Sequence, residues 1–285
     1  MNIDNFHPLI LNVGLARMNA NWNWKNVCSP FARLYCVTEG DAIVTVNDRT
    51  YQLLPGHLYL IPPFARHSYS CSGRFTHYYT HIYTEGIIGS EIYEEYDLPF
   101  EVECEEGDEQ LFARLVRNNP SMALSQSNPQ TYDNTYTLAR FIAFNKGRSE
   151  SLKMESRGIV LQLFARFVAK ATMRSFTRDE RLLRATNYIL YHLADPLTIE
   201  QLASEACLSP EHFIRIFSHH VGMTPMFYIT CKRMEQAQLL LVTTDRMISD
   251  IAFSLGYSDT SYFVRVFKRI TGVTPGMYRR NSCSR

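Results

Sequence analysis

The chain has 285 residues and an almost balanced charge, with 29 Lys and Arg against 28 Asp and Glu. Hydrophobic residues make up 46% and charged residues 20%, which supplies enough apolar side chains for sizeable cores and excludes a disordered chain. This length predicts two compact domains, and the net charge of +1 gives the chain as a whole no electrostatic attraction to a polyanion.

The N-terminus and the cysteines bear on the compartment in which the chain works. Met1–Asp4 is not a basic segment leading into an apolar run, and no stretch approaches the roughly 18 apolar residues of a membrane span. We therefore expect a cytoplasmic protein without a membrane partner. The seven cysteines are odd in number, scattered and free of any Cys-x-x-Cys pair, which disfavours a disulfide framework or a structural zinc site and predicts buried or inert thiols.

Short β-strands separated by turns are predicted from residue 31 to about residue 85. Val44–Val46 and Tyr51–Leu53 flank a polar turn at Asn47–Arg49, which is typical of a hairpin. Thr76–Tyr83 alternates, so that every second side chain lies on one face of a strand. That face carries His77, Tyr79, His81 and Tyr83. Strands this close together favour a sandwich or a small barrel.

Beyond Pro99 the apolar residues take helical spacing. Two stripes, in 111–116 and 159–168, indicate helices, and a stripe of this kind more often packs into a core than binds a partner. The polar stretch 118–134 contains two prolines and is expected to be a loop between helices. A charged stretch at Thr177–Asp179 predicts the boundary with the C-terminal third.

The last hundred residues contain an internal duplication. Phe213–Phe217 recurs as Phe263–Phe267, and Gly222–Pro225 recurs as Gly272–Pro275, at an offset of 50 positions. Matches upstream of these are offset by 49, so the second copy has one extra residue in its turn.

Each copy has the marks of a helix-turn-helix. Thr198 and Gln201 form a capping-box pattern that opens a first helix, and Ser209-Pro210 supplies an N-cap and a proline for the second. Gly222 and Gly272 follow the second helix of each copy and suit the left-handed backbone conformation that often ends a helix. A connecting helix over 225–241, roughly 25 Å long, would hold two recognition helices about one DNA turn apart.

A longer pattern runs through the second copy. Its residues are Ile248-Ser249-Asp250-Ile251-Ala252, Gly256-Tyr257, Ser261-Tyr262-Phe263, Arg265, Phe267-Lys268, Gly272, Thr274-Pro275 and Tyr278-Arg279. Over about residues 181–281 the chain resembles the C-terminal signature of AraC-type transcription regulators. The first copy departs from the pattern at Cys207, where the second has Gly256, and at Ser218-His219, where the second has Lys268-Arg269.

The resemblance implies contacts with the bases of double-stranded DNA. Phe213, Phe217, Phe263 and Phe267 are expected to form the buried stripes. The base contacts expected are Glu211, Ile214, Arg215, Thr260, Ser261, Val264 and Arg265. An arginine that binds guanine O6 and N7 contributes about 1–3 kcal/mol of discrimination. The alternative for Arg215 is a surface ion pair with Glu211.

Local charge favours phosphate contacts in the second copy. Thr260 to Arg285 holds six cations and no acidic residue, whereas residues 178–259 hold more acids than cations. The expected phosphate contacts are Lys268, Arg269, Arg279 and Arg280. The alternative is that these side chains are ordinary solvated surface.

A second pattern lies in the strand-rich part. Its residues are Tyr51, Leu53, Pro55-Gly56, Leu58, Leu60, Pro62-Pro63, His67 and Tyr69. Over about residues 31–85 the chain resembles the cupin-type effector domain found with such DNA-binding units. Metal-binding cupins have a His-x-His pair where this chain has Glu39-Gly40-Asp41, and no His-x-His occurs in the sequence, so we expect no metal.

The strand-rich part also offers a candidate ligand pocket. His67, Tyr69, Tyr79 and His81, together with His77, are expected to line a polar and aromatic pocket. The resemblance suggests a sugar or a related metabolite as the effector. The equal alternative is that these are barrel-lining side chains hydrogen-bonded among themselves.

The expected fold is an α+β multidomain chain. Residues 1–107 form a cupin-like β-barrel, residues 108–177 a helical linker and dimerisation segment, and residues 178–285 an all-α domain with two helix-turn-helix motifs. The resemblance implies a ligand-responsive activator that works as a homodimer with RNA polymerase and needs no cofactor or catalysis. Two rivals stay open, a cupin-type sugar-modifying metalloenzyme with a helical appendage and a DNA-binding regulator whose barrel only dimerises.

Overall fold

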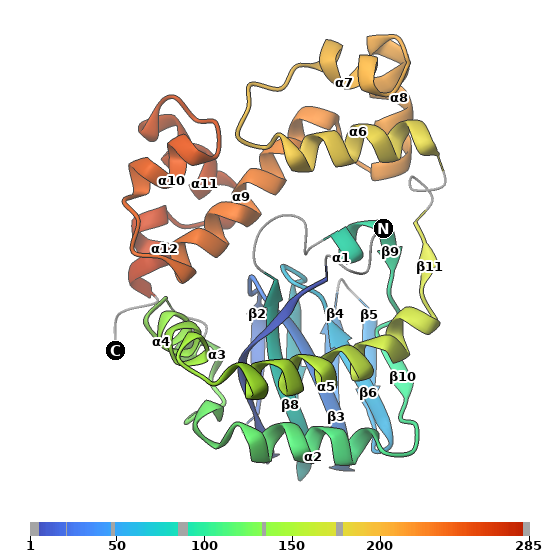
Figure 1. Cartoon of the computed structure of the whole chain (residues 1–285), viewed down its shortest axis with the longest axis vertical. Coiled ribbons are helices and arrows are strands. Elements are labelled where there is room, and N and C mark those ends of the chain that lie inside the picture. The colour runs from blue at the N-terminus through green and yellow to red at the C-terminus, as the bar shows by residue number, and fades with distance from the viewer. Residues whose placement is uncertain are drawn as a thin grey trace. The chain divides into compact units, whose positions relative to one another are not determined.

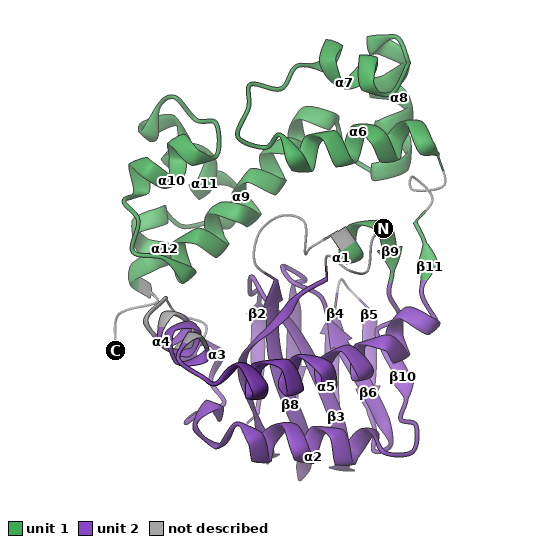
Figure 2. Cartoon of the chain, in the orientation of Figure 1, with its two compact units in different colours: residues 1–3, 86–97, 172–284 green, residues 4–85, 98–171, 285 purple. Residues whose placement is uncertain are grey.

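The computed structural model describes residues 6–20, 22–46, 49–84, 91–132, 135–174 and 179–281. The chain divides into two compact units (Figure 2). We call residues 4–85 and 98–171 the sheet unit, and residues 86–97 and 172–284 the helical unit. The expectations for Met1–Asp4, the Asn47-Asp48 turn, the boundary at Thr177-Arg178 and Cys283 fall outside the described residues.

The sheet unit holds two antiparallel sheets (Figure 1). One sheet has the order β1 (Pro8–Met18), β8 (Phe75–Thr84), β3 (Ala32–Gly40), β6 (His57–Ile61), β10 (Glu101–Glu103). The other has the order β2 (Trp24–Val27), β7 (His67–Ser70), β4 (Ala42–Val46), β5 (Arg49–Leu53). One core joins them, because Tyr35 and Val37 of the first sheet and Val44 and Tyr69 of the second belong to the same buried cluster. The predicted sandwich or barrel is confirmed.

Strands β1, β2 and β10 lie outside the stretch predicted to be strands. The first half of β1 is buried almost without interruption, so it lacks the alternation that marks a half-exposed strand. Its neighbours are β8 on one side and helices α2 (Asp108–Asn118) and α5 (Glu150–Ala169). The short strand β10 has only one apolar residue, Val102, and pairs with β6. Propensity alone could not find either strand.

The helices of the sheet unit follow the predicted stripes. Phe112 and Leu115 of α2 and Leu163 and Phe167 of α5 are buried, and the two helices pack on each other (Figure 1). The stripe is therefore core. Helix α4 (Thr135–Lys146) packs on β1.

The stretch 118–134 is more ordered than the predicted loop. It contains a 3-10 turn, η3 (Pro120–Met122), and a short helix, α3 (Pro129–Tyr132). Each proline opens a helical turn, where its missing N–H costs no hydrogen bond. The predicted connection between helices holds for the irregular residues 123–128, but the two prolines begin helical turns that the loop prediction did not include.

The helical unit carries the duplicated motif. Its elements are α1 (Glu91–Glu95), β9 (Tyr96–Asp97), β11 (Thr172–Met173), α6 (Glu180–Tyr191), α7 (Ile199–Glu205), α8 (Pro210–Val221), α9 (Pro225–Thr243), α10 (Ile248–Ser254), α11 (Thr260–Thr271) and α12 (Pro275–Asn281). The first copy of the motif is α7 and α8, the second is α10 and α11, and α9 connects them (Figure 1). Among the described residues, no helix combines the length and apolar character needed to cross a membrane.

The predicted helix starts and ends are confirmed. Thr198 and Gln201 form both bonds of the capping box, and the Ser209 side chain accepts the backbone N–H of His212 at the start of α8. Gly222 and Gly272 end α8 and α11 with φ of 79° and 85°. Helix α9 has 19 residues, roughly 28 Å at 1.5 Å per residue.

Each copy has its own hydrophobic core. Phe213 and Phe217 lie in the first core and Phe263 and Phe267 in the second, and all four side chains are fully buried. Helix α9 serves both, because Tyr228 near its start belongs to the first core and Met234, Ala237 and Leu241 belong to the second. The predicted phenylalanine stripes are confirmed.

The turn inside each copy needs a left-handed residue. In the second copy this residue is Gly256, with φ of 77°. In the first copy Cys207 takes the same position with φ of 53°, although it has a Cβ. The departure from the pattern at Cys207 is therefore a change of residue type and not of backbone shape.

A short segment from the N-terminal half of the chain, residues 86–97, belongs to the helical unit. The half-buried carboxylate of Glu94 in α1 pairs with Lys232 of α9 and accepts a hydrogen bond from the Tyr228 hydroxyl at 3.0 Å. Lys232 also pairs with Glu235 at 2.8 Å. Burial alone would lower the pKa of Lys232, but the two carboxylates raise it above its usual value, so the ammonium stays charged.

Candidate nucleic-acid interface and internal pocket

Helices α8 and α11 each present one polar face to solvent. On α8, Glu211, Ile214 and Arg215 are exposed beside the buried phenylalanines. On α11, Ser261 and Arg265 are exposed in the same way. Side chains of this kind, near the start of the second helix of a helix-turn-helix, are the ones that reach base edges in the major groove.

Two of the expected base contacts are less available. Val264 is half-buried and packs against the second core, and Thr260 is half-buried in the first turn of α11. Both residues lie beside the helix face that carries Phe263 and Phe267, and this face is buried in the core. Glu211 and Arg215 form no ion pair with each other in the described chain, so the Arg215 guanidinium is not held in that way.

Tyr262 is an exposed aromatic residue that the sequence reasoning did not select. Its side chain is 51% exposed, and the Arg265 guanidinium lies 5.8 Å from its ring centroid. A cation over an aromatic ring is attracted by the ring's quadrupole, so Tyr262 favours an outward position of Arg265. The spacing of three residues on a helix was the available signal.

The cations of the second copy differ in how free they are. Lys268, Arg269 and Arg280 are exposed, and Lys268 and Arg269 lie in the last turn of α11. Arg279 is half-buried, and its Nε donates to the Leu241 carbonyl at 3.4 Å. Arg279 therefore holds α12 against α9, which competes with a phosphate contact.

Arg233 of α9 connects the two copies. Its Nε donates to the Leu193 carbonyl at 2.8 Å and its Nη2 to the Asp195 carbonyl at 2.7 Å, both in the chain between α6 and α7. The same guanidinium lies 5.5 Å from the ring centroid of Tyr257 in the turn of the second copy. Burial lowers the pKa of Arg233 from its usual value. One side chain thus fixes the orientation of one helix-turn-helix against the other.

The sheet unit contains a cavity of about 450 Å³. Its wall is made by Leu15, Ala16, Arg17, Met18, Trp22, Tyr35, His77, Tyr79, His81, Leu124, Ser125, Gln126, Ser127 and Tyr132. Tyr79 and His81 line it, as does His77. His67 and Tyr69 are not part of the wall, although the Tyr69 hydroxyl is hydrogen-bonded at 2.8 Å to that of Tyr35.

Much of this wall could not be selected from the sequence. Trp22 lies just before β2 and is stacked on Tyr69, with ring centroids 4.4 Å apart. Leu124 and Tyr132 come from the stretch expected to be a loop, and the Leu124 backbone N–H donates to the Tyr79 hydroxyl at 2.7 Å. The helical stretch therefore closes a pocket that the strands begin.

The histidines of the pocket are neutral. Burial lowers the pKa of His77 to about 3, and burial with the nearby Arg33 charge lowers that of His81 well below its usual value. Within the described chain, the Nδ1 atoms of His77 and His81 are buried and have no hydrogen-bond partner. Side chains hydrogen-bonded only among themselves would leave no such atoms, so the described contacts do not show the mutual bonding that the alternative interpretation requires.

The histidines, cysteines and acidic residues that the structure describes do not gather into a metal-binding group. Across the described residues, no three or more His, Cys, Asp and Glu side chains are arranged to hold a metal ion.

Two family models match the chain, one in each part. Residues 13–124 match an AraC-like ligand binding domain, and residues 202–281 match a helix-turn-helix domain. The regulatory protein PocR of Salmonella typhimurium is 38% identical over 111 residues, 39% of this chain and 37% of that protein. The arabinose operon regulatory protein of Escherichia coli is 37% identical over 102 residues, 35% of this chain and 35% of that protein.

Among solved structures, ToxT from Vibrio cholerae is similar over 96% of this chain and 98% of its own, at 15% identity and a TM-score of 0.50. That likeness concerns the fold. The chain spans little more than a third of the length of PocR and of the arabinose operon regulatory protein. In both parts the chain is therefore similar to AraC-type transcription regulators, through the ligand binding domain over 13–124 and the helix-turn-helix domain over 202–281.

Proposed function

We propose that the chain is a sequence-specific DNA-binding transcription regulator that reads two successive major-groove segments with α8 and α11. The observation that carries the proposal is the pair of helix-turn-helix motifs, each with its own core and an exposed polar face, joined by α9 and by Arg233. We assign base contacts to Arg265, Ser261, Arg215, Ile214 and Glu211, and phosphate contacts to the exposed cations of the second copy.

We further propose that a small uncharged metabolite, a sugar or a related compound, binds in the cavity of the sheet unit. The neutral imidazoles offer hydrogen bonds to hydroxyl groups, and the rings of Trp22, Tyr35 and Tyr132 offer apolar faces. No catalysis is involved. As an activator working in the cytoplasm, the chain would contact RNA polymerase.

We also propose a homodimer formed through the helices of residues 108–177. Phe144 on α4 and Met154 on α5 are 45% and 72% exposed, so these helices offer large apolar side chains to a partner. The boundaries 1–107, 108–177 and 178–285 stay our proposal for the functional division. In the structure, the helices up to Ala171 belong to the same compact unit as the sheets.

Selection from a randomised duplex library tests the DNA proposal on the full chain. We expect recovered sites to hold two base clusters about one helical turn apart, bound roughly a thousandfold or more tighter than scrambled DNA at ~0.15 M salt. The slope of log affinity against log salt should be about −3 or steeper, because Lys268, Arg269 and Arg280 are exposed. Equal affinity for selected and scrambled duplexes would remove the proposal.

A thermal-shift screen of sugars, polyols and other neutral metabolites tests the pocket. We expect a binding compound to raise the melting temperature of the full chain and of His57→Phe, which lies outside the pocket, but not of His77→Phe. The same substitution removes ring nitrogens in both variants, so only the pocket position should matter. A shift retained in His77→Phe, or turnover of the bound compound, would contradict the pocket as an effector site.

A further inference from the structure

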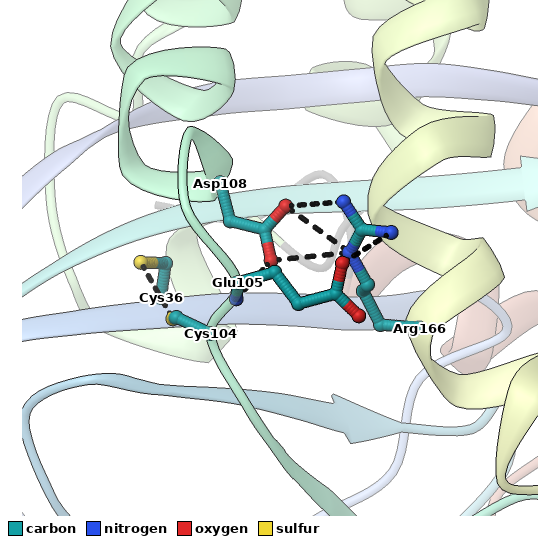
Figure 3. A network of polar contacts seen from close by, with 5 residues as sticks. All are labelled: Cys36, Cys104, Glu105, Asp108 and Arg166. Carbon is teal, nitrogen blue, oxygen red and sulfur yellow. Dashed lines mark hydrogen bonds and ion pairs between the residues drawn. The ribbon is translucent and has the colours of Figure 1, made fainter.

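Two cysteines that are far apart in the sequence lie side by side in the sheet unit. The Sγ atoms of Cys36 and Cys104 are 3.8 Å apart and share a hydrogen bond (Figure 3). Cys36 lies on β3, the strand between β8 and β6, and is buried. Cys104 directly follows β10 and is half-exposed. A reagent in solution can therefore reach the Cys104 thiol, whereas the Cys36 thiol is covered.

Cys104 is bonded to the chain beside β6 and is followed by irregular chain. The Cys104 backbone N–H donates to the Gly56 carbonyl at 2.8 Å, but the residues up to the start of α2 form a turn. A disulfide needs an S–S distance of about 2.05 Å, so the sulfurs must approach by roughly 1.8 Å. A turn between a three-residue strand and a helix can make that shift more readily than the central strand can.

We propose that Cys36 and Cys104 are a redox-sensing pair that closes reversibly into a disulfide when small-molecule disulfides, such as oxidised glutathione, accumulate. The proposal concerns only these two residues and their neighbours, so it holds or fails independently of the DNA-binding function. It revises the expectation that the cysteines are inert, which spacing along the chain could not test.

The exchange takes place in two balanced steps. The Cys104 thiolate attacks one sulfur of the small-molecule disulfide, forms a mixed disulfide and releases one small thiolate. The Cys36 sulfur, after losing its proton to that thiolate, then attacks Cys104 Sγ and releases the second small thiolate, which takes a proton from water. The two cysteines lose two electrons in total and the small disulfide gains two.

The electrostatics agree with this order of attack. Either sulfur could donate the hydrogen bond between the two thiols. When Cys36 donates it, the bond lowers the pKa of the Cys104 thiol, and the same bond together with burial raises the pKa of Cys36. Burial and the carboxylates of Asp108 and Glu109 act against the Cys104 thiolate. The half-exposed cysteine is thus the better nucleophile, and the buried one is kept protonated until a mixed disulfide forms.

An ion-pair network connects the pair to helix α5. Glu105, the residue after Cys104, pairs with Arg166 at 3.0 Å, and Asp108 pairs with the same guanidinium at 3.1 Å (Figure 3). The Glu105 backbone N–H donates to Asp108 at 2.8 Å. Arg166 lies in the last turn of α5, close to where the chain enters the helical unit. Pulling Cys104 toward β3 therefore displaces Glu105 and loosens the end of α5.

Equilibration of the full chain in glutathione buffers of varied thiol-to-disulfide ratio tests the pair. After acid quenching and alkylation, peptide mapping should find a Cys36–Cys104 disulfide whose fraction follows the ratio and returns to zero with excess thiol. Cys71→Ser is the matched control, since Cys71 is also buried but its sulfur, within the part of the chain that the structure describes, donates to the Asp41 and Gly73 carbonyls and not to another cysteine. It should behave as the unmodified chain.

The variants separate the two roles. Cys36→Ser should accumulate a glutathione adduct on Cys104, and Cys104→Ser should form neither the disulfide nor that adduct. Amide hydrogen exchange over 160–170 should quicken on oxidation of the unmodified chain and stay unchanged in Cys104→Ser. A stable glutathione adduct on Cys104 of the unmodified chain, a disulfide between other cysteines, or no oxidation at any ratio would overturn the pair. Unchanged exchange after disulfide formation would overturn the link to α5.

Discussion

Replacing Arg265 with alanine should lower affinity for the selected DNA site by about 5- to 150-fold, equivalent to about 1–3 kcal/mol. The guanidinium is exposed on α11 beside Tyr262 and has no carboxylate partner among the described residues. A bidentate contact to guanine accounts for both the size of the loss and its dependence on sequence. Competition binding with selected and scrambled duplexes at ~0.15 M salt measures it.

Lys268→Ala is the matched control for Arg265→Ala. Lys268 is exposed two turns from the start of the same helix, where it is expected to meet phosphate. It should weaken binding to both duplexes alike and reduce the salt slope by about 1. If Arg265→Ala kept the original preference for the selected site, the base contact assigned to Arg265 would be wrong.

Replacing Gly256 with alanine should destabilise the chain by about 2–4 kcal/mol. The glycine has φ of 77°, and an added Cβ would lie 2.5 Å from the Ala194 carbonyl oxygen and 2.9 Å from the Arg233 guanidinium. The clash would push the turn of the second copy away from the first and disturb the bonds of Arg233. Urea unfolding monitored by circular dichroism measures the loss.

The first copy supplies the opposite test. Cys207 has φ of 53° and an exposed side chain, so Cys207→Gly should leave stability unchanged or raise it by up to about 1 kcal/mol. The two substitutions act on the same turn position with opposite expected signs. If Gly256→Ala unfolded at the same urea concentration as the unmodified chain, the close approach of Gly256 to Ala194 would not contribute to stability.

The helical unit was predictable because its signals are local. The capping box at Thr198, the Ser209-Pro210 start and the glycine ends all act within a few residues. Because the motif is duplicated, signals in one copy could be checked against the other. The buried phenylalanines followed from helical spacing alone. Helical spacing did not predict the half-burial of Val264, because this depends on how α11 packs against the core of the second copy.

The sheet unit was less predictable because its determinants are distant in sequence. Strand β1 has no alternation, since helices cover the side that a half-exposed strand would leave to solvent. Trp22 and Tyr132 meet at the cavity only after the strands and the following helices have folded together. His67 and Tyr69 share the strand alternation of the pocket residues but lie on the other sheet, behind Tyr35.

Glu94 limits what a shortened protein can report. A fragment that begins at residue 178 keeps both helix-turn-helix motifs and α9 but loses α1, and with it one of the two carboxylates that pair with Lys232 and the acceptor of the Tyr228 hydroxyl. The start of α9 would then expose apolar and charged groups that are covered in the intact chain. The surface of such a fragment therefore differs from that of the intact chain near the start of α9. A DNA affinity measured on the fragment applies to the whole protein only when residues 86–97, which include Glu94, are also present.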